Sequence, residues 1–125
     1  VDHFKRFNDT HGHEAGDIVL RELGQFLKSM IRGSDIACRY GGEEFMILLP
    51  EASLKITQQR AEQLRSGIKH INPQHRRQPL GVISLSLGVA SFPQHGNTAE
   101  TVVRAADAAL YQAKTQGRDR VVIAE

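Results

Sequence analysis

The sequence contains a single cysteine, Cys38, so no internal disulfide can form. A lone thiol is typical of proteins in a reducing compartment, and we expect a cytoplasmic location. No apolar run is long enough to span a bilayer, and no signal peptide pattern is present. We therefore expect no direct membrane contact from this segment, although a parent protein could be anchored elsewhere.

Runs of lysine and arginine are also missing, and the formal net charge is only +2. The sequence therefore lacks the basic tail or stripe typical of proteins that bind nucleic-acid polymers. A length of 125 residues suits one domain with one core, here residues 1–125. Because Val1 is not a methionine and the chain begins close to the candidate site residues Asp2, Lys5 and Asn8, we interpret it as a fragment, truncated at its N-terminal strand. We expect a regulatory domain or domains upstream.

The hydrophobic pattern predicts helices and strands in alternation. Apolar residues recur every three or four positions in the predicted helices, which are 19–31, 53–71 and 98–115. Strands are predicted from alternating or continuous apolar residues over 35–40, 44–49, 83–89 and 121–123. The polar segments 8–16 and 72–79 are predicted as loops. A strand ending near Val1 would complete the sheet, giving an α/β or α+β layer with helices over a sheet.

The most informative motif is Gly41-Gly42-Glu43-Glu44-Phe45, at the predicted hairpin between two strands. Glycines allow a tight turn and leave room for a bulky group against the main chain. Carboxylates at such a turn can bind hard divalent cations through oxygen. The motif therefore favours a nucleoside triphosphate site with its metal on the acids, although a plain turn with polar residues at its tip stays an alternative.

Together with its surroundings, this motif resembles the GGDEF family of diguanylate cyclases. The other segments that carry the resemblance are Val1 to Lys5, Asn8-Asp9, Gly12-His13, Gly16-Asp17, Cys38 to Tyr40, Ser86 to Ala90, Ala106 to Lys114 and Gly117-Arg118. The resemblance covers essentially the whole chain. It implies an α+β fold (an α/β sandwich) with a ferredoxin-like palm related to class III nucleotide cyclases, in which helices flank a central, mostly antiparallel sheet.

The resemblance also implies a reaction in which two GTP become cyclic di-GMP and two pyrophosphates. Each subunit binds one GTP, so catalysis needs a homodimer. The implied cofactor is Mg²⁺, two ions per GTP, with Mn²⁺ as an alternative. Glu43 is the expected metal ligand and base, Glu44 and the backbone carbonyl of Val1 are further metal ligands, and an aspartate expected before Val1 lies outside this sequence.

Asn8 and Asp17 are, by resemblance, the residues that read guanine. A carboxylate can accept from guanine N1–H and N2–H₂, and an asparagine can both donate and accept. Taken singly, Asn8 could instead be a helix N-cap, and Asp17 a first-turn acid favoured by the helix dipole.

The phosphates are assigned to a second group of residues. Lys5 would stabilise transition-state charge, with Lys114 and Arg118 as further phosphate ligands. Charges that complement a helix dipole are the alternative for the last two. The amides near Phe4 and Lys5, at a helix N-terminus, could also cradle phosphate. His13 could contact nucleotide or make a structural hydrogen bond.

In a separate motif, Arg32-Gly33-Ser34-Asp35, five residues separate Asp35 from Gly41. In the family this spacing marks an inhibitory site for the product cyclic di-GMP, with Arg32 on guanine or phosphate and Asp35 accepting from guanine. A helix-ending turn with a local Arg–Asp pair is the alternative.

Two other functions compete with an active cyclase. One is a catalytically inactive receptor that binds cyclic di-GMP at Arg32 and Asp35. The other is a cyclase that uses ATP or makes a mixed dinucleotide, which Asp17 argues against.

Overall fold

Only Gly12 separates the first two helices, α1 (Phe4–His11) and α2 (His13–Met30). The prediction of a loop over 8–16 is therefore wrong. The polar residues of that segment are largely exposed and tolerate a helix, while Phe4 and Phe7 stack one turn apart with ring centroids 6.4 Å apart. Gly12, at φ 91°, donates its N–H to the Asn8 carbonyl at 2.7 Å and so closes α1.

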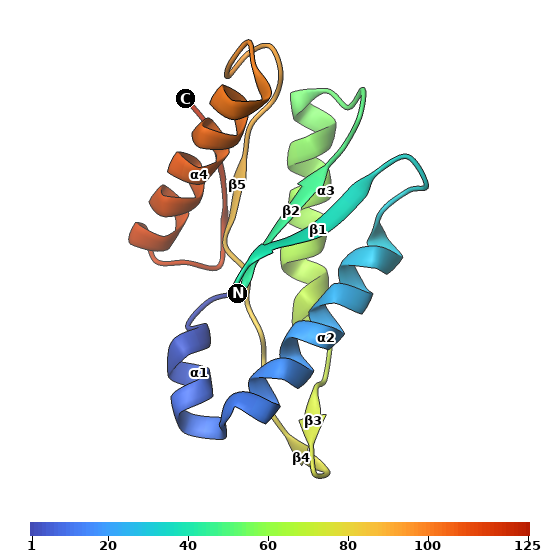
Figure 1. The fold of residues 1–125 in the computed structure, drawn as a ribbon, viewed down its shortest axis with the longest axis vertical. Coiled ribbons are helices and arrows are strands. Elements are labelled where there is room, and N and C mark those ends of the chain that lie inside the picture. The colour runs from blue at the N-terminus through green and yellow to red at the C-terminus, as the bar shows by residue number, and fades with distance from the viewer. The chain divides into compact units, whose positions relative to one another are not determined.

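The computed structural model describes all residues from 1 to 125, which divide into two compact units. The first unit comprises Val1, His3–Pro50 and Gly67–Ile83, and the second comprises Asp2, Glu51–Ser66 and Ser84–Glu125. Figure 1 labels the elements of both.

In the first unit, β1 (Ile36–Gly41) pairs antiparallel with β2 (Glu44–Leu48), as predicted. Ile36 lies opposite Leu48 and Gly41 opposite Glu44, with a register shift between Arg39 and Gly41. Such an irregularity bends the ribbon near its tip. Figure 1 shows the two strands as a twisted hairpin.

The buried apolar residues of the first unit come mainly from one face of α2. They are Ala15, Val19, Leu20, Leu23, Leu27, Ile68, Pro73, Leu80 and Ile83. The spacing within α2 is the three-to-four pattern that predicted this helix.

The segment 72–79, predicted as a loop, instead forms a short antiparallel hairpin of β3 (Gln74–His75) and β4 (Gln78–Pro79). Its turn residues, Arg76 and Arg77, have φ values of 53° and 66°. A turn at Arg76 and Arg77 was not predicted, because glycine or asparagine usually occupies such left-handed positions.

The second unit contains α3 (Leu54–Gly67, apart from its last residue), β5 (Leu87–Val89), α4 (Ala99–Thr115) and β6 (Val121–Ile123). A 3₁₀ turn, Ile68–His70, follows α3 in place of the predicted helix end. The strands β5 and β6 pair in parallel. Gly88 lies directly against α4, because a Cβ there would overlap the Ala106 carbonyl and stand 3.0 Å from Leu110 Cα.

Both ends of α4 follow local sequence signals. Thr98 caps the N-terminus by accepting from the Thr101 N–H at 3.2 Å. At the other end Gly117 has φ 119°, and the Arg118 N–H reaches back to the Ala113 carbonyl at 2.9 Å. This is the bond of a Schellman motif.

The α+β class is confirmed. The strands form three two-stranded pairs, two antiparallel and one parallel, in place of the continuous sheet that we expected. Of the predicted strand 83–89, only the last three residues pair as β5. No helix has both the length and the apolar character required to cross a membrane.

Candidate functional site

The tip of the β1–β2 hairpin carries the glycine and glutamate residues of the signature. Gly42 has φ 46°, a conformation that suits glycine, and its carbonyl accepts from Arg39 Nε at 2.8 Å. A Cβ on Gly41 or on Gly42 would meet no atom within 4 Å. The turn therefore explains Gly42 but not Gly41, and the space over both is open.

Glu43 lies beside the start of the chain. The main-chain nitrogen of Val1 donates to the Glu43 carbonyl at 3.3 Å, and both Glu43 and Glu44 are half-buried. No group of three or more His, Cys, Asp or Glu side chains converges on a metal position. Mg²⁺ typically takes one or two carboxylates and fills its shell with waters and substrate phosphates. Glu43 and Glu44 supply two carboxylates and Val1 a carbonyl, which are oxygen donors of the kind that Mg²⁺ prefers.

Asn8 and Asp17 come from two adjacent helices. Asn8 lies inside α1 and packs against Gly16 of α2, where a Cβ would overlap Asn8 Oδ1 and stand 2.9 Å from its Cγ. Asn8 Oδ1 is buried without a hydrogen-bond partner. Asp17 follows Gly16 directly and is exposed, so the packing places the Asn8 amide beside the turn of α2 that carries Asp17.

The structural alternatives for these two residues are wrong. The N-caps of α1 and α2 are His3 and Gly12, so Asn8 caps neither helix. The first-turn acid of α2 is Glu14, and Asp17 lies beyond that turn.

The start of α1 presents Phe4 and Lys5. No side chain caps this end and no acid lies in the first turn, so the first N–H groups have no side-chain acceptor there. Lys5 is exposed. Phe4 packs near Gly16, since a Cβ built on Gly16 would stand 3.2 Å from Phe4 Cζ. His13, the first residue of α2, is exposed.

Arg32 and Asp35 form a tight turn after α2. The Arg32 N–H donates to Asp35 Oδ2 at 2.8 Å, and the Asp35 N–H donates to the Arg32 carbonyl at 3.0 Å. The predicted local turn is therefore present, but it uses the main chain of Arg32. The Arg32 residue itself is exposed.

Lys114 and Arg118 belong to the second unit. Lys114 is in the last turn of α4, where its charge complements the helix dipole. Arg118 follows the helix with φ 63°, and its Nη1 lies 3.5 Å from the Lys114 carbonyl. Both residues are half-buried.

Known proteins match this chain over almost its whole length. The family model described as "Diguanylate cyclase, GGDEF domain" matches residues 1–120. The chain belongs to the GGDEF domain family. Diguanylate cyclase A of Treponema denticola is 39% identical over 125 residues, which cover 100% of this chain and 33% of that protein. This GGDEF domain thus spans about a third of that relative.

Solved structures agree with this GGDEF assignment. The GGDEF domain of DgcB from Caulobacter crescentus, in complex with c-di-GMP, has a TM-score of 0.90 and 36% identity, covering 98% of this chain and 72% of that one. The active GGEEF domain of a diguanylate cyclase from Vibrio cholerae has a TM-score of 0.88 and 34% identity, and the match covers 99% of this chain and 78% of that chain.

The sequence did not reveal the polar network of this GGDEF domain around Asp2. The Asp2 carboxylate accepts from the Ser84 hydroxyl at 2.7 Å, from the Ser86 hydroxyl, and from the Asp119 N–H at 3.1 Å. The alternation of Ser84 and Ser86 with apolar residues predicted a strand there, but the structure begins β5 only at Leu87. The alternation gave no sign of a carboxylate more than 80 positions away.

Arg65 of α3 extends this network. Its Nη1 contacts Asp119 Oδ1 at 3.0 Å and its Nη2 contacts Glu62 Oε2 at 3.1 Å. The hydrogen bond to Glu62 and then that to Asp119 raise the pKa of Arg65 above its ordinary value. An arginine is charged throughout the working pH range in any case, and the stability that these two bonds contribute would be lost only as pH rises through the raised pKa.

Proposed function

We propose that this GGDEF domain is half of a diguanylate cyclase, in which two copies condense two GTP into cyclic di-GMP and two pyrophosphates. The observation that carries the proposal is the open glycine tip with Glu43 beside the main chain of Val1. Carboxylate, carbonyl and uncovered main chain are the groups that a metal-bound triphosphate requires. The known active GGEEF domain has glutamate at the same signature position as Glu43.

Each candidate site residue is assigned one role in this proposal. Glu43, with Glu44 and the Val1 carbonyl, would hold Mg²⁺, which when bound neutralises phosphate charge and lowers the pKa of a hydroxyl nucleophile. Asn8 and Asp17 would read guanine, since a buried polar group left unpaired by adenine disfavours the wrong base. Lys5, Lys114 and Arg118, with the amides at Phe4 and Lys5, would bind the phosphates.

The reaction needs two active-site halves. The 3′-oxygen of one GTP forms a bond to the α-phosphorus of the other and loses its proton, with Glu43 as the base. The bond from that phosphorus to the bridging oxygen breaks, and pyrophosphate leaves with the electron pair. The second linkage forms by the same exchange, so a homodimer is required.

Product inhibition is a second part of the proposal. The exposed Arg32 and the turn-forming Asp35 would bind cyclic di-GMP, because a guanidinium can fork onto guanine or phosphate. One of the structural neighbours was solved with c-di-GMP.

The full-length protein should be incubated with Mg²⁺ and either GTP or ATP, and the nucleotides separated by chromatography. We expect cyclic di-GMP from GTP alone, and a loss of about 100-fold or more in kcat for Glu43→Gln, equivalent to several kcal/mol of charge stabilisation. Glu51→Gln, an exposed acid in the turn after β2, is the matched control and should leave the rate unchanged. Binding of cyclic di-GMP without turnover would favour the receptor, and consumption of ATP would favour the other cyclase.

A further inference from the structure

The turn after α4 has a left-handed backbone over three consecutive residues. The φ values are 119° at Gly117, 63° at Arg118 and 48° at Asp119. Glycine adopts this region freely and aspartate tolerates it, whereas most other residues, such as arginine, cost roughly 1–2 kcal/mol there. Such conformations persist only where surrounding contacts hold them, and they concentrate at functional sites.

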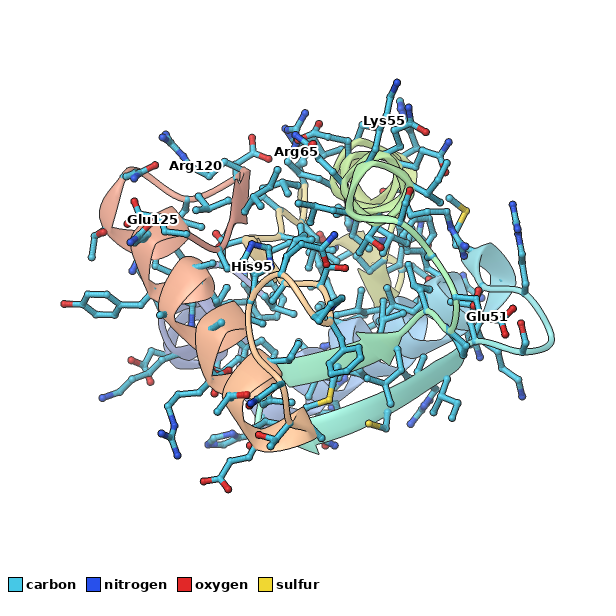
Figure 2. All side chains as sticks on the ribbon, turned by 90° about the horizontal axis from the view of Figure 1, so that it is seen from above. Glu51, Lys55, Arg65, His95, Arg120 and Glu125 are labelled. Atoms are coloured by element: carbon cyan, nitrogen blue, oxygen red, sulfur yellow. The ribbon has the colours of Figure 1, made fainter.

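Contacts from distant parts of the second unit hold this turn. The Asp119 N–H donates to the Asp2 carboxylate at 3.1 Å, and the Asp119 carboxylate accepts from Arg65 at 3.0 Å. Asp119 is therefore fixed at both its main chain and its side chain. Figure 2 shows Arg65 on the side of α3 towards the segment that carries Arg120.

Asp2 is held by contacts at both its main chain and its carboxylate. Its own N–H donates to the Ser84 carbonyl at 3.1 Å, and its carboxylate accepts from the hydroxyls of Ser84 and Ser86 as well as from Asp119. These bonds fix both carboxylate oxygens in direction. The Asp119 N–H thus meets an acceptor whose position is set by Ser84 and Ser86, in the segment that leads into β5.

The turn determines where Arg118 places its side chain. The Arg118 carbonyl accepts from Arg120 Nε at 3.1 Å, while its Nη1 stays near the Lys114 carbonyl at the end of α4. A right-handed backbone at Arg118 would redirect the Cα–Cβ bond and move the guanidinium away from Lys114.

We propose that Asp2 and Arg65 are positioning residues, which hold the turn at 117–119 so that Arg118 is presented to the phosphates of a bound nucleotide. This inference rests on the proposed function, because Arg118 is taken there as a phosphate ligand. Neither positioning residue needs to touch the substrate. Loss of either one would weaken nucleotide binding through Arg118.

The test is a double-mutant cycle on the full-length protein. Arg118→Ala should raise the KM for GTP about tenfold, as expected for one lost charge-assisted hydrogen bond, with a smaller change in kcat. Arg65→Met should raise KM several-fold alone, and should add nothing in the Arg118→Ala background. Arg65→Lys, which keeps one donor to Asp119, should recover part of the loss.

Arg104→Met is the matched control. Arg104 also pairs with a carboxylate, Glu100 at 2.6 Å, within the same unit, but its partner lies on its own helix. This variant should leave the KM unchanged. Amide hydrogen exchange provides a readout without substrate, since the Asp119 amide should lose protection in Arg65→Met and in Asp2→Ala while core amides of α4 keep theirs.

The outcomes separate the two levels of the proposal. If Arg118→Ala raises KM but Arg65→Met does not, or if the two effects add fully, the positioning role is wrong. An Asp119 amide that exchanges equally in wild type and variants also overturns it. If the protein converts no GTP, or if Arg118→Ala leaves KM unchanged, the phosphate role of Arg118 fails and the inference falls with it.

Discussion

The substitution Gly16→Ala tests the guanine site through a residue that packs against Asn8. A Cβ on Gly16 would stand 2.9 Å from Asn8 Cγ and 3.2 Å from Phe4 Cζ, and would overlap Asn8 Oδ1. Carbon contacts below 3.0 Å are essentially never observed for a real Cβ. Because Oδ1 lies at the end of a flexible side chain, we expect the Asn8 amide to swing away while both helices persist.

The magnitude follows from two opposing terms. Crowding at a packed site costs about 1–3 kcal/mol, while replacing glycine by alanine inside a helix gains about 1 kcal/mol. We therefore expect a net loss of stability of about 2 kcal/mol or less. Removing the Asn8 hydrogen bond to guanine should cost about 1–2 kcal/mol, which is roughly a five- to thirtyfold weaker Kd.

The assay is calorimetric titration of a slowly reacting GTP analogue into the full-length protein with Mg²⁺, with thermal unfolding measured in parallel. Gly24→Ala is the matched control, because it lies in the same helix and its Cβ would meet no atom within 4 Å. That variant should gain up to about 1 kcal/mol in stability and bind normally. A folded Gly16→Ala protein with wild-type Kd would refute the role assigned to Asn8.

Three further predictions concern separate parts of the chain. Gly88→Ala should destabilise the protein by about 3 kcal/mol or more and lower the midpoint of urea unfolding. The reason is that the new Cβ would meet the main chain of α4, which cannot swing aside. An unchanged midpoint would contradict this packing. Arg77→Gly should stabilise the protein by about 1 kcal/mol in the same assay by relieving a left-handed residue at φ 66°, and a loss of stability would count against that turn. Arg32→Ala should relieve inhibition of GTP turnover by added cyclic di-GMP with little change in the uninhibited rate, and unchanged inhibition would remove this site.

Local signals in the sequence predicted much of the fold. The α4 helix lies within one residue of the predicted range because Thr98 caps it and apolar residues recur along it. The β1–β2 hairpin follows from two apolar runs around Gly41 and Gly42. These features depend on residues close together in the chain, which is why a pattern could reveal them.

Where the prediction failed, the deciding contacts were tertiary or the turn residues unusual. The polar run through Asn8 indicated a loop, yet the packing of Asn8 on Gly16 places it in a helix against α2. The β3–β4 turn uses Arg76 and Arg77, which are not typical of left-handed positions. In both places the backbone conformation departs from the preference of the local sequence.

For the candidate site, too, the sequence predicted the local motif but not the contacts between distant residues. The signature motif identified the acidic hairpin tip, and the structure adds the hydrogen bond between Val1 and Glu43. The contacts of Asp2 with Ser84 and of Arg65 with Asp119 join residues 82 and 54 positions apart. No spacing rule links such pairs, so only the folded chain shows them.

The most direct test of the central claim, that Glu43 at the hairpin tip binds the metal of a guanine nucleotide, is calorimetry with a slowly reacting GTP analogue in the presence and absence of Mg²⁺. Wild-type full-length protein should bind the analogue with Mg²⁺ and much more weakly without it, and Glu43→Gln should lose most of this dependence on Mg²⁺. Equal affinity with and without Mg²⁺ in the wild type, or an unaltered Mg²⁺ dependence in Glu43→Gln, would contradict the account.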